Sequence, residues 1–320
     1  MTAIVPRRRL GPQGPEVPVL GLGSWHTWDR LPFAQSVALL RHATAAGITL
    51  FDVGVYGPHD AAPPAISDVL FGAILRESGL GRSDVVLSVK LWLELWGDGG
   101  LGPQLETALR RLGSGHADLV VLGDLRRDDI ALPALVRDLA RLTDRGLIRA
   151  WGVNNWSAGN IARLIDTAGA EGLPPPRLAQ LKYSVARRAI PDGAPFAGLF
   201  DAGFRMQASD ILEGGILAGK TTPAREIGRD PGGIRGRIVA AAEPLAALAQ
   251  GWGTSAATLA MAFALSHPAC VNALFGATSV AQVDQALAAL ALLQRIGPAP
   301  LRAAVEPLWC DRGVVNPEGP

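Results

Sequence analysis

The chain has 320 residues, of which 48% are hydrophobic and 18% charged, so it can bury a large core and is not expected to be disordered. Its 30 Lys and Arg and 29 Asp and Glu leave a formal net charge of +1, which predicts no nucleic acid and no anionic membrane as partner. There are two cysteines, and no CxxC or Cys/His cluster indicates a metal site. The sequence has no signal peptide and no apolar run of about 18 residues, so we expect a cytoplasmic protein.

Predicted strands and helices alternate along the chain. The start, RRRLGPQGPEVPVL, contains prolines that exclude a helix, and two short extended pieces around residues 11–15 predict an N-terminal β-hairpin. Short apolar runs predict strands at 19–23, 48–52, 85–90, 118–123, 149–155, 178–183, 204–209 and 271–276. Apolar periodicity predicts helices at 32–46, 66–77, 104–112, 132–144, 158–168, 196–202, 244–251, 255–266 and 280–295.

Strands that alternate with helices in this number favour a closed (β/α)8 TIM barrel, and we expect residues 1–320 to form one such domain. A doubly wound open sheet is the alternative, although no GxGxxG motif follows the first strand. Residues 221–237, rich in Gly, Arg and Pro, are too long for an ordinary strand-to-helix connection. They are therefore predicted to form a lid or ligand loop.

Polar side chains follow most of the predicted strands. Functional groups of a parallel barrel collect at the C-terminal ends of its strands, so we expect one shared site there. These strand ends are, in chain order, Ser24-Trp25, Asp52 with Tyr56, Lys90, Gly123-Asp124, Asn154-Asn155, Gln180, Ser209-Asp210 and Gly276.

Asp52, Tyr56 and Lys90 suggest a proton donor. A free phenol has a pKa of about 10 and is a weak acid at neutral pH, but a nearby lysine ammonium favours the phenolate form. Asp52 would hold that ammonium charged and oriented, and Tyr56 could then donate a proton as hydride reaches the adjacent carbon. The structural alternative is that Asp52 caps the next helix and Tyr56 covers the end of the barrel.

A series of motifs spans almost the whole chain. They are RRLGPQGPEVPVLGLGSW, FDVGVYG, SVK, RRLGSGHADLVVLG, GVNNWS, LEGGILAGK and GATSVAQV. In this order they resemble the aldo-keto reductase superfamily, in its voltage-gated potassium channel beta-subunit-like and bacterial branch. The resemblance implies a (β/α)8 barrel that binds NADPH in extended form at the strand ends and reduces carbonyl groups of a small-molecule substrate.

The same resemblance assigns roles to individual residues. It makes Asp52, Tyr56 and Lys90 the catalytic set. The cofactor-binding positions it implies are Ser24, Trp25, Asn154, Asn155, Gln180, Ser209, Asp210, Leu212, Gly215, Lys220, Arg235, Gly276, Ser279 and Gln282. Basic residues in or beside the long loop, Lys220, Arg235 and Arg237, could contact phosphate, or could simply be solvated. An oligomer is compatible with the sequence.

Some positions depart from the family pattern. The family's catalytic histidine falls at Gly123, the aromatic residue that stacks on nicotinamide at Ser209, and an adenine-binding asparagine at Ala286. The position that is often basic for the 2′-phosphate is Ser279. Removal of one donor to a developing oxyanion typically costs about 10²–10³ in rate, so ordinary carbonyl reduction is expected to be weak. The space freed at Gly123 could admit a bulkier substrate, or a C=N or C=C group.

Aromatic residues follow the first and third predicted strands. Trp25, Trp28, Trp92 and Trp96 are expected to form an aromatic, mostly apolar pocket wall. Glu94 lies among them and is expected to be exposed, with a role as an extra acid or base as the alternative. Asp124 is expected to be structural.

Two hypotheses remain open at this point. The first is an NADPH-dependent oxidoreductase that reduces a small, largely apolar organic substrate, with Tyr56 as proton donor. The second is a non-redox enzyme of the same fold, in which Tyr56 and Lys90 perform a proton transfer, elimination or cyclisation in a biosynthetic pathway. The departures at Gly123, Ser209 and Ala286 support the second hypothesis.

Overall fold

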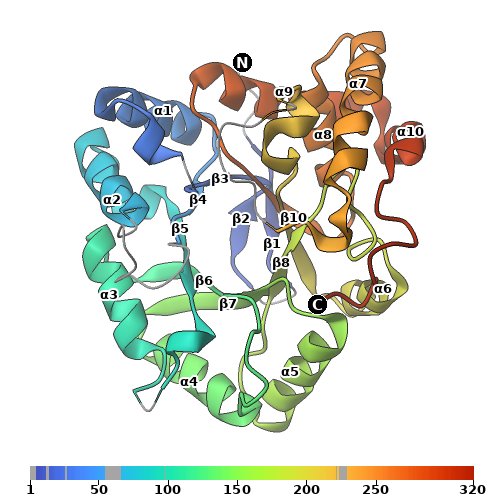
Figure 1. The fold of residues 1–320 in the computed structure, drawn as a ribbon. Coiled ribbons are helices and arrows are strands. Elements are labelled where there is room, and N and C mark those ends of the chain that lie inside the picture. Colours follow the sequence, from blue (N-terminus) through green and yellow to red (C-terminus); the bar gives the residue numbers. More distant parts are fainter. Residues whose placement is uncertain are drawn as a thin grey trace.

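The computed structural model describes residues 5–11, 14–25, 27–54, 66–97, 99–220, 222 and 229–320. In this part of the chain, eight parallel strands close into a barrel in the order β10-β3-β4-β5-β6-β7-β8-β9, surrounded by helices (Figure 1). The strands are β3 (Leu20–Gly23), β4 (Leu50–Asp52), β5 (Val86–Leu91), β6 (Ala117–Leu122), β7 (Ile148–Asn154), β8 (Leu178–Lys182), β9 (Arg205–Ser209) and β10 (Cys270–Phe275). The predicted (β/α)8 barrel is therefore confirmed.

Helices α1 to α8 lie between barrel strands in the chain, α9 and α10 follow the last strand, and the helices cover the outside of the barrel (Figure 1). They are α1 (Phe33–Ala45), α2 (Ser67–Ser78), α3 (Gly102–Leu112), α4 (Leu132–Asp144), α5 (Ala158–Ala170), α6 (Ala194–Asp201), α7 (Arg235–Gly251), α8 (Ala256–Leu265), α9 (Val280–Ile296) and α10 (Pro298–Ala304). Short 3-10 turns add η1 (Trp28–Arg30), η2 (Arg82–Asp84), η3 (Leu93–Leu95), η4 (Glu213–Ala218), η5 (Pro231–Gly233) and η6 (Glu306–Leu308). Among the described residues, no helix is long and apolar enough to cross a membrane.

The predicted N-terminal hairpin is also confirmed. Strand β1 (Arg7–Arg9) pairs antiparallel with β2 (Glu16–Pro18). Leu10 and Val17, beside and within these strands, are buried against apolar side chains of the barrel interior. The Arg8 side chain donates to the backbone carbonyl of Cys270 in β10. The hairpin therefore closes the N-terminal end of the barrel, and the opposite end, which we call the mouth, is left for ligands.

Inside the barrel, the side chains next to the hairpin are mostly apolar, with the Asn272 amide among them, and polar side chains lie nearer the mouth. The apolar layer next to the hairpin consists of Leu50, Leu119, Val121, Ala150, Leu178, Val271 and Leu274. Because side chains alternate between the two faces of a strand, the residue two positions after a buried interior leucine points inward again. This places Asp52 after Leu50 and Gln180 after Leu178, one layer nearer the mouth.

Helix α7 differs from its prediction. It begins at Arg235, nine residues before the predicted start at 244, and Pro244 lies inside it. Proline favours the first helical turn, but here nine helical residues precede it. Buried side chains that include Ile238, Ala241 and Leu245 lie on both sides of the proline, and the helix packs against η4 and α8. The predicted long loop is shorter as a result and ends at residue 234.

The C-terminal segment was not predicted. After α9 the chain forms α10 and η6 and then runs past α6 (Figure 1). The Glu318 carbonyl accepts from the backbone N–H of Ala158, and the Glu318 carboxylate accepts from that of Gly159 at 2.5 Å, both in the first turn of α5. The tail thus satisfies donors that a helix N-terminus leaves unpaired.

Candidate active site

Asp52 and Lys90 form an ion pair inside the mouth of the barrel. Asp52 ends β4 and Lys90 lies in the neighbouring strand β5. Lys90 Nζ lies 3.1 Å from Asp52 Oδ2, and both side chains are almost wholly buried. Ser88 Oγ donates to the other carboxylate oxygen at 3.4 Å. The next helix among the described residues, α2, has Ile66 as its N-cap, so Asp52 holds Lys90 and does not cap that helix.

Gln180, in strand β8, forms hydrogen bonds to both members of this pair. Its Oε1 accepts from Lys90 Nζ at 2.5 Å. Its Nε2 donates to Asp52 Oδ2 at 3.2 Å and to Gln207 Oε1 at 2.8 Å. Because both amide hydrogens of Gln180 are used, this side chain could meet a ligand only through its oxygen, as an acceptor.

Tyr56, the third member of the predicted catalytic set, lies outside the described residues. The chain that leaves β4 passes directly against Lys90. A Cβ atom at Gly54 would lie 2.8 Å from Lys90 Cβ and 2.9 Å from Lys90 Cγ. Glycine at position 54 therefore allows the backbone to approach the lysine stem closely.

The indole of Trp92 occupies the space beside Gly123. The Gly123 backbone N–H donates to the Leu91 carbonyl at 2.8 Å, which places position 123 next to the end of β5. A Cβ atom at Gly123 would lie 2.4 Å from Trp92 Cε3 and 2.7 Å from Cζ3. The expectation that a missing histidine frees room for substrate is wrong, because an aromatic ring from the neighbouring strand end fills that room.

Asn154 and Asn155 are held by Asp124. Asn154 Nδ2 donates to Asp124 Oδ1 at 2.5 Å, and Asn155 Nδ2 reaches the same oxygen at 3.3 Å. Asn155 has a φ of 53°, a left-handed conformation that asparagine tolerates better than most residues. Arg229 also approaches Asp124, with Nη1 3.4 Å from Oδ2. Asp124 is thus structural, and it engages the two amides that the resemblance assigned to the nicotinamide.

A cavity of about 220 Å³ opens beside Asp52 and Gln180. Its walls come from the ends of β3, β9 and β10, from η4 and from the start of α9. The predicted cofactor-binding residues that line it are Trp25, Gln180, Ser209, Asp210, Leu212, Gly215, Lys220, Gly276 and Gln282. Thr27, Arg30, Thr278 and Gln285 line it as well and were not predicted. Arg30 follows the first barrel strand with no motif around it, so only the fold places its cation at this cavity.

Other predicted cofactor residues lie elsewhere among the described residues. Ser24 is buried and accepts from Trp28 Nε1 at 2.9 Å. Ser279 caps α9, where its hydroxyl accepts from the Gln282 backbone N–H at 3.3 Å. Arg235 begins α7, and its backbone N–H donates to Asp230 at 3.0 Å. Arg237, on the same helix, donates to the Cys310 carbonyl at 3.3 Å.

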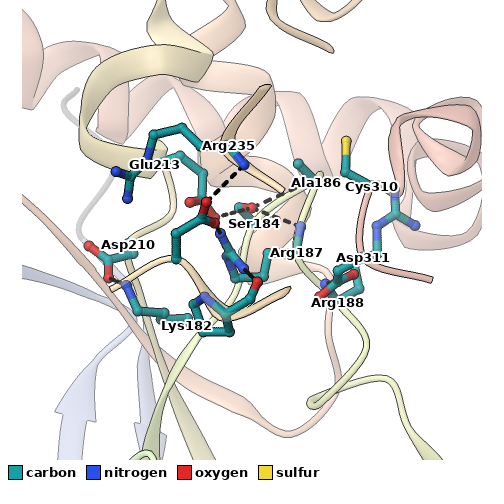
Figure 2. A network of polar contacts seen from close by, with 12 residues as sticks. Lys182, Ser184, Ala186, Arg187, Arg188, Asp210, Glu213, Arg235, Cys310 and Asp311 are labelled. Carbon is teal, nitrogen blue, oxygen red and sulfur yellow. Dashed lines mark hydrogen bonds and ion pairs between the residues drawn. The ribbon is translucent and has the colours of Figure 1, made fainter. Parts of the chain in front are cut away.

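Arg187 lies at the centre of a network of polar contacts that includes Glu213 of η4 (Figure 2). Its Nε donates to Glu213 Oε1 at 3.2 Å, at the start of η4, and Ser184 Oγ donates to the same oxygen at 2.9 Å. Its Nη2 donates to Asp230 Oδ1 at 2.8 Å, and its Nη1 donates to the Pro231 carbonyl at 2.8 Å. Burial raises the pKa of Glu213, and the Arg187 charge opposes that rise. Residues 213 and 230, at the two sides of the long loop, are therefore tied to one cation.

The predicted tryptophan wall is only partly present. Trp25 lines the cavity, and Trp92 packs beside Gly123. Trp28 is buried against Phe71, with ring centroids 5.6 Å apart. Trp96 donates from its indole to Asp138 at 3.1 Å, away from the strand ends. Trp28 and Trp96 therefore support the structure and do not face the cavity. Their positions on loops after the strands did not indicate in which direction the side chains point.

Glu94 and Arg126 lie beside Trp92. Arg126 Nη1 lies 3.2 Å from Glu94 Oε1, and its guanidinium stands 5.7 Å from the centre of the Trp92 ring. Glu94 is exposed, as expected from the sequence. Its ion pair to Arg126 gives it a role in holding that cation over the indole.

Comparison with known proteins agrees with the motifs. The sequence model of the aldo/keto reductase family matches residues 19–295. A protein from Oryza sativa subsp. japonica, described as a probable voltage-gated potassium channel subunit beta, is 27% identical over 323 aligned positions. That alignment covers 91% of this chain and 93% of the rice protein.

Proposed function

Because the chain belongs to the aldo/keto reductase family, whose members are generally NAD(P)H-dependent oxidoreductases, we propose that it is an NADPH-dependent oxidoreductase. Its substrate would be a small, largely apolar organic molecule that carries a C=O, C=N or C=C group. Tyr56 would be the proton donor, and Asp52 and Lys90 would set its acidity. The 27% identity to the rice protein supports a place in the channel beta-subunit-like and bacterial branch, and the proposal includes no channel partner.

One observation carries this proposal: the Asp52–Lys90 pair is buried at the end of a cavity lined by residues that suit a nucleotide. The backbone at Gly214 and Gly215 has φ values of 71° and 103°, which side-chain-bearing residues rarely adopt, and lets a ligand approach the main chain closely. Lys220 and Arg30 supply cations to the same cavity. Gln282 and Gln285 line it at the first turns of α9. These residues would suit a ligand that carries phosphate.

When bound, NADPH would supply a hydride to the substrate. The residues of this chain then have the remaining tasks. Lys90, held by Asp52 and Gln180, would present its ammonium to the Tyr56 phenol and favour release of the phenolic proton. The proton would pass from Tyr56 to the substrate atom that becomes negative as the adjacent carbon is reduced. Lys220 would hold phosphate through a charge-assisted hydrogen bond.

The Trp92 indole supports the choice of an apolar substrate. At position 123 the chain offers no imidazole to orient a carbonyl, and the ring beside it is apolar on its face. A substrate near position 123 would find no hydrogen-bond donor in the family's usual place. Simple aldehydes should therefore be poor substrates, and a more hydrophobic acceptor should be better.

The second candidate is a non-redox enzyme that uses Tyr56 and Lys90 for proton transfer, elimination or cyclisation. The engagement of Asn154 and Asn155 by Asp124 favours it, because one amide hydrogen of each side chain is already used and fewer donors remain for a nicotinamide. Ser209 and Ala286 point the same way, since neither can supply the aromatic ring or the amide of the family pattern.

Titration of the purified protein with NADPH and with NADH separates the two candidates. Trp25 lines the cavity, so cofactor binding should quench tryptophan fluorescence and give energy transfer to the dihydronicotinamide. Lys220→Met should weaken NADPH binding by about tenfold, because a charged hydrogen bond is worth roughly 1.5–3 kcal/mol. Arg237→Met, at a helix position that contacts the Cys310 carbonyl, is the control and should bind as the wild type does. If neither cofactor binds at millimolar concentration, the oxidoreductase is excluded and the non-redox enzyme is supported.

Tyr56→Phe tests the proton donor itself. The variant should bind NADPH nearly as tightly as the wild type and lose turnover, because the phenol acts only in the proton-transfer step. Near wild-type turnover in this variant would remove Tyr56 from the mechanism.

A further inference from the structure

A chain of hydrogen-bonded amides crosses the interior of the barrel and ends on Lys90. Asn272 Nδ2 donates to the Pro18 carbonyl at 2.7 Å, and Gln207 Nε2 donates to Asn272 Oδ1 at 2.9 Å. Gln180 Nε2 donates to Gln207 Oε1 at 2.8 Å, and Lys90 Nζ donates to Gln180 Oε1 at 2.5 Å. The chain therefore links β2 of the hairpin, through β10, β9 and β8, to the lysine in β5.

These amides are costly to bury. Gln207 and Asn272 are 0% exposed, inside a barrel whose interior is usually filled by branched apolar side chains. A buried amide without partners costs free energy, and even a fully bonded one gains little over an apolar side chain of similar shape. Packing alone therefore does not explain why two amides stand here next to leucines.

The direction of the chain is set at both ends. A backbone carbonyl can only accept, so Asn272 must turn its NH₂ toward Pro18 and its oxygen toward Gln207. Gln207 must then donate to Asn272 and accept from Gln180. At the other end an ammonium can only donate, so Gln180 must turn its oxygen toward Lys90. Both ends require the same orientation, and a flip of either amide would oppose two donors or two acceptors.

We propose that Gln207 and Asn272 are positioning residues that hold the Gln180 amide in one orientation and, through it, hold the Lys90 ammonium beside Asp52. The proposal rests on the proposed function for the assignment of Lys90 to the reaction. Each amide oxygen in the chain points toward Lys90, so the amide dipoles add in the low-dielectric interior and stabilise the ammonium. Without Gln207, the Gln180 amide loses one of its two acceptors and is held only by Asp52 and Lys90.

The test is nuclear magnetic resonance of the lysine ammonium groups in the full chain without added ligand. The sequence contains three lysines, Lys90, Lys182 and Lys220, so ¹⁵N-lysine labelling gives a simple spectrum. Lys182→Arg and Lys220→Arg assign the remaining signal. A buried, hydrogen-bonded ammonium exchanges its protons slowly with water, so Lys90 should give a sharp signal in the wild-type protein.

Gln207→Met and Asn272→Leu each interrupt the series of hydrogen-bonded amides at a different residue, and neither adds a charge. Each should speed proton exchange at Lys90 by about tenfold or more, the factor that corresponds to loss of one typical hydrogen bond. The side chain of Asn272 bonds to Pro18 and Gln207, so its effect on the lysine should travel along the chain of amides. Met206→Leu, a buried change on β9 next to Gln207 in sequence, is the control for small losses of stability.

An unchanged Lys90 signal in either variant that folds, as judged by its thermal melt, would overturn the proposal and leave the amides with a packing role. The readout needs neither cofactor nor turnover. Failure of the protein to bind NADPH would therefore count against the proposed function and leave the lysine result standing. Conversely, NADPH binding with an unchanged Lys90 signal in the variants would overturn the positioning role alone.

Discussion

The Trp92 indole and Gly123 fit together so closely that neither position can be changed independently. A Cβ atom at position 123 would lie 2.4 Å from Trp92 Cε3, well inside contact distance. Trp92 is fixed from its other side as well, because Gln104 Oε1 accepts from the Trp92 backbone N–H at 2.6 Å and Gln104 Nε2 donates to its carbonyl at 3.1 Å. These bonds hold the Trp92 backbone in place next to position 123.

Gly123→Ala should therefore destabilise the protein by about 1–3 kcal/mol, the usual cost of extra volume in a packed interior. The same substitution in a Trp92→Ala background should cost much less, because the obstructing ring is gone. Urea denaturation of the wild type, both single variants and the double variant measures this coupling. Additive effects of the two substitutions would contradict the close fit.

Restoration of a histidine needs a change at Trp92. Gly123→His alone should fold poorly and gain no carbonyl reduction. Combined with Trp92→Ala, it should raise reduction of a generic aldehyde with NADPH, by up to the roughly 10²–10³ expected for one restored donor. The Trp92→Ala single variant is the control, because it opens the space beside Gly123 without adding an imidazole. Efficient aldehyde reduction by the wild type would show that another group already fills this role.

Lys90→Met should be strongly destabilising, because Asp52 would remain as a buried charge without its cation. Removal of one partner from a buried pair typically costs about 3–5 kcal/mol. The double variant Lys90→Met with Asp52→Leu should recover much of that loss while remaining inactive. Comparison of the two by urea denaturation distinguishes a charge effect from a packing effect, since a packing effect would not be recovered.

Arg187→Met should loosen the part of the long loop around Asp230. The variant removes the cation that ties Glu213 to Asp230 across the loop. Trypsin should cleave after Arg229, whose side chain is 64% exposed, faster than in the wild type. Arg137→Met, at a surface pair with Glu171, is the control. Equal cleavage of Arg187→Met and the wild type would mean that other contacts fix the loop.

His267 should make stability depend on pH. Burial lowers the pKa of His267 to about 4, although Asp192 raises it in part; Arg302 lowers it further. As the pH falls from about 6.5 to about 4, the unfolded chain binds a proton at this histidine before the folded protein does, so stability falls with pH over that window. The loss from this group should be about 3 kcal/mol.

Urea denaturation between pH 4 and 7 in His267→Gln measures this dependence. The variant keeps an acceptor for the Ala269 N–H and should show a shallower decline of stability toward low pH than the wild type. Met206→Leu, a buried change that removes no titratable group, is the control and should keep the wild-type decline. Identical declines for His267→Gln and the wild type would assign the pH dependence to other groups.

The sequence alone was sufficient to predict the barrel, the N-terminal hairpin and the polar residues at the ends of the strands. Apolar runs of strand length, separated by helical periods, leave few other ways to bury the core. Because parallel strands share one polarity, the positions of Asp52, Lys90 and Gln180 along the chain also assign them to one end of the barrel. Those predictions depend on local pattern and on strand direction, which the order of residues encodes.

The tertiary structure decided which side chains face the cavity and which partners they already have. Trp28 turned to the core and Trp92 into the space beside Gly123, because ring direction depends on neighbours far apart in the sequence. Asp124 engages Asn154 and Asn155, and Pro18 starts the amide chain that reaches Lys90. Such contacts join residues from different strands, and no local period or spacing encodes them. The availability of each polar group for a ligand is therefore a property of the packed barrel, and residue type alone could not predict it.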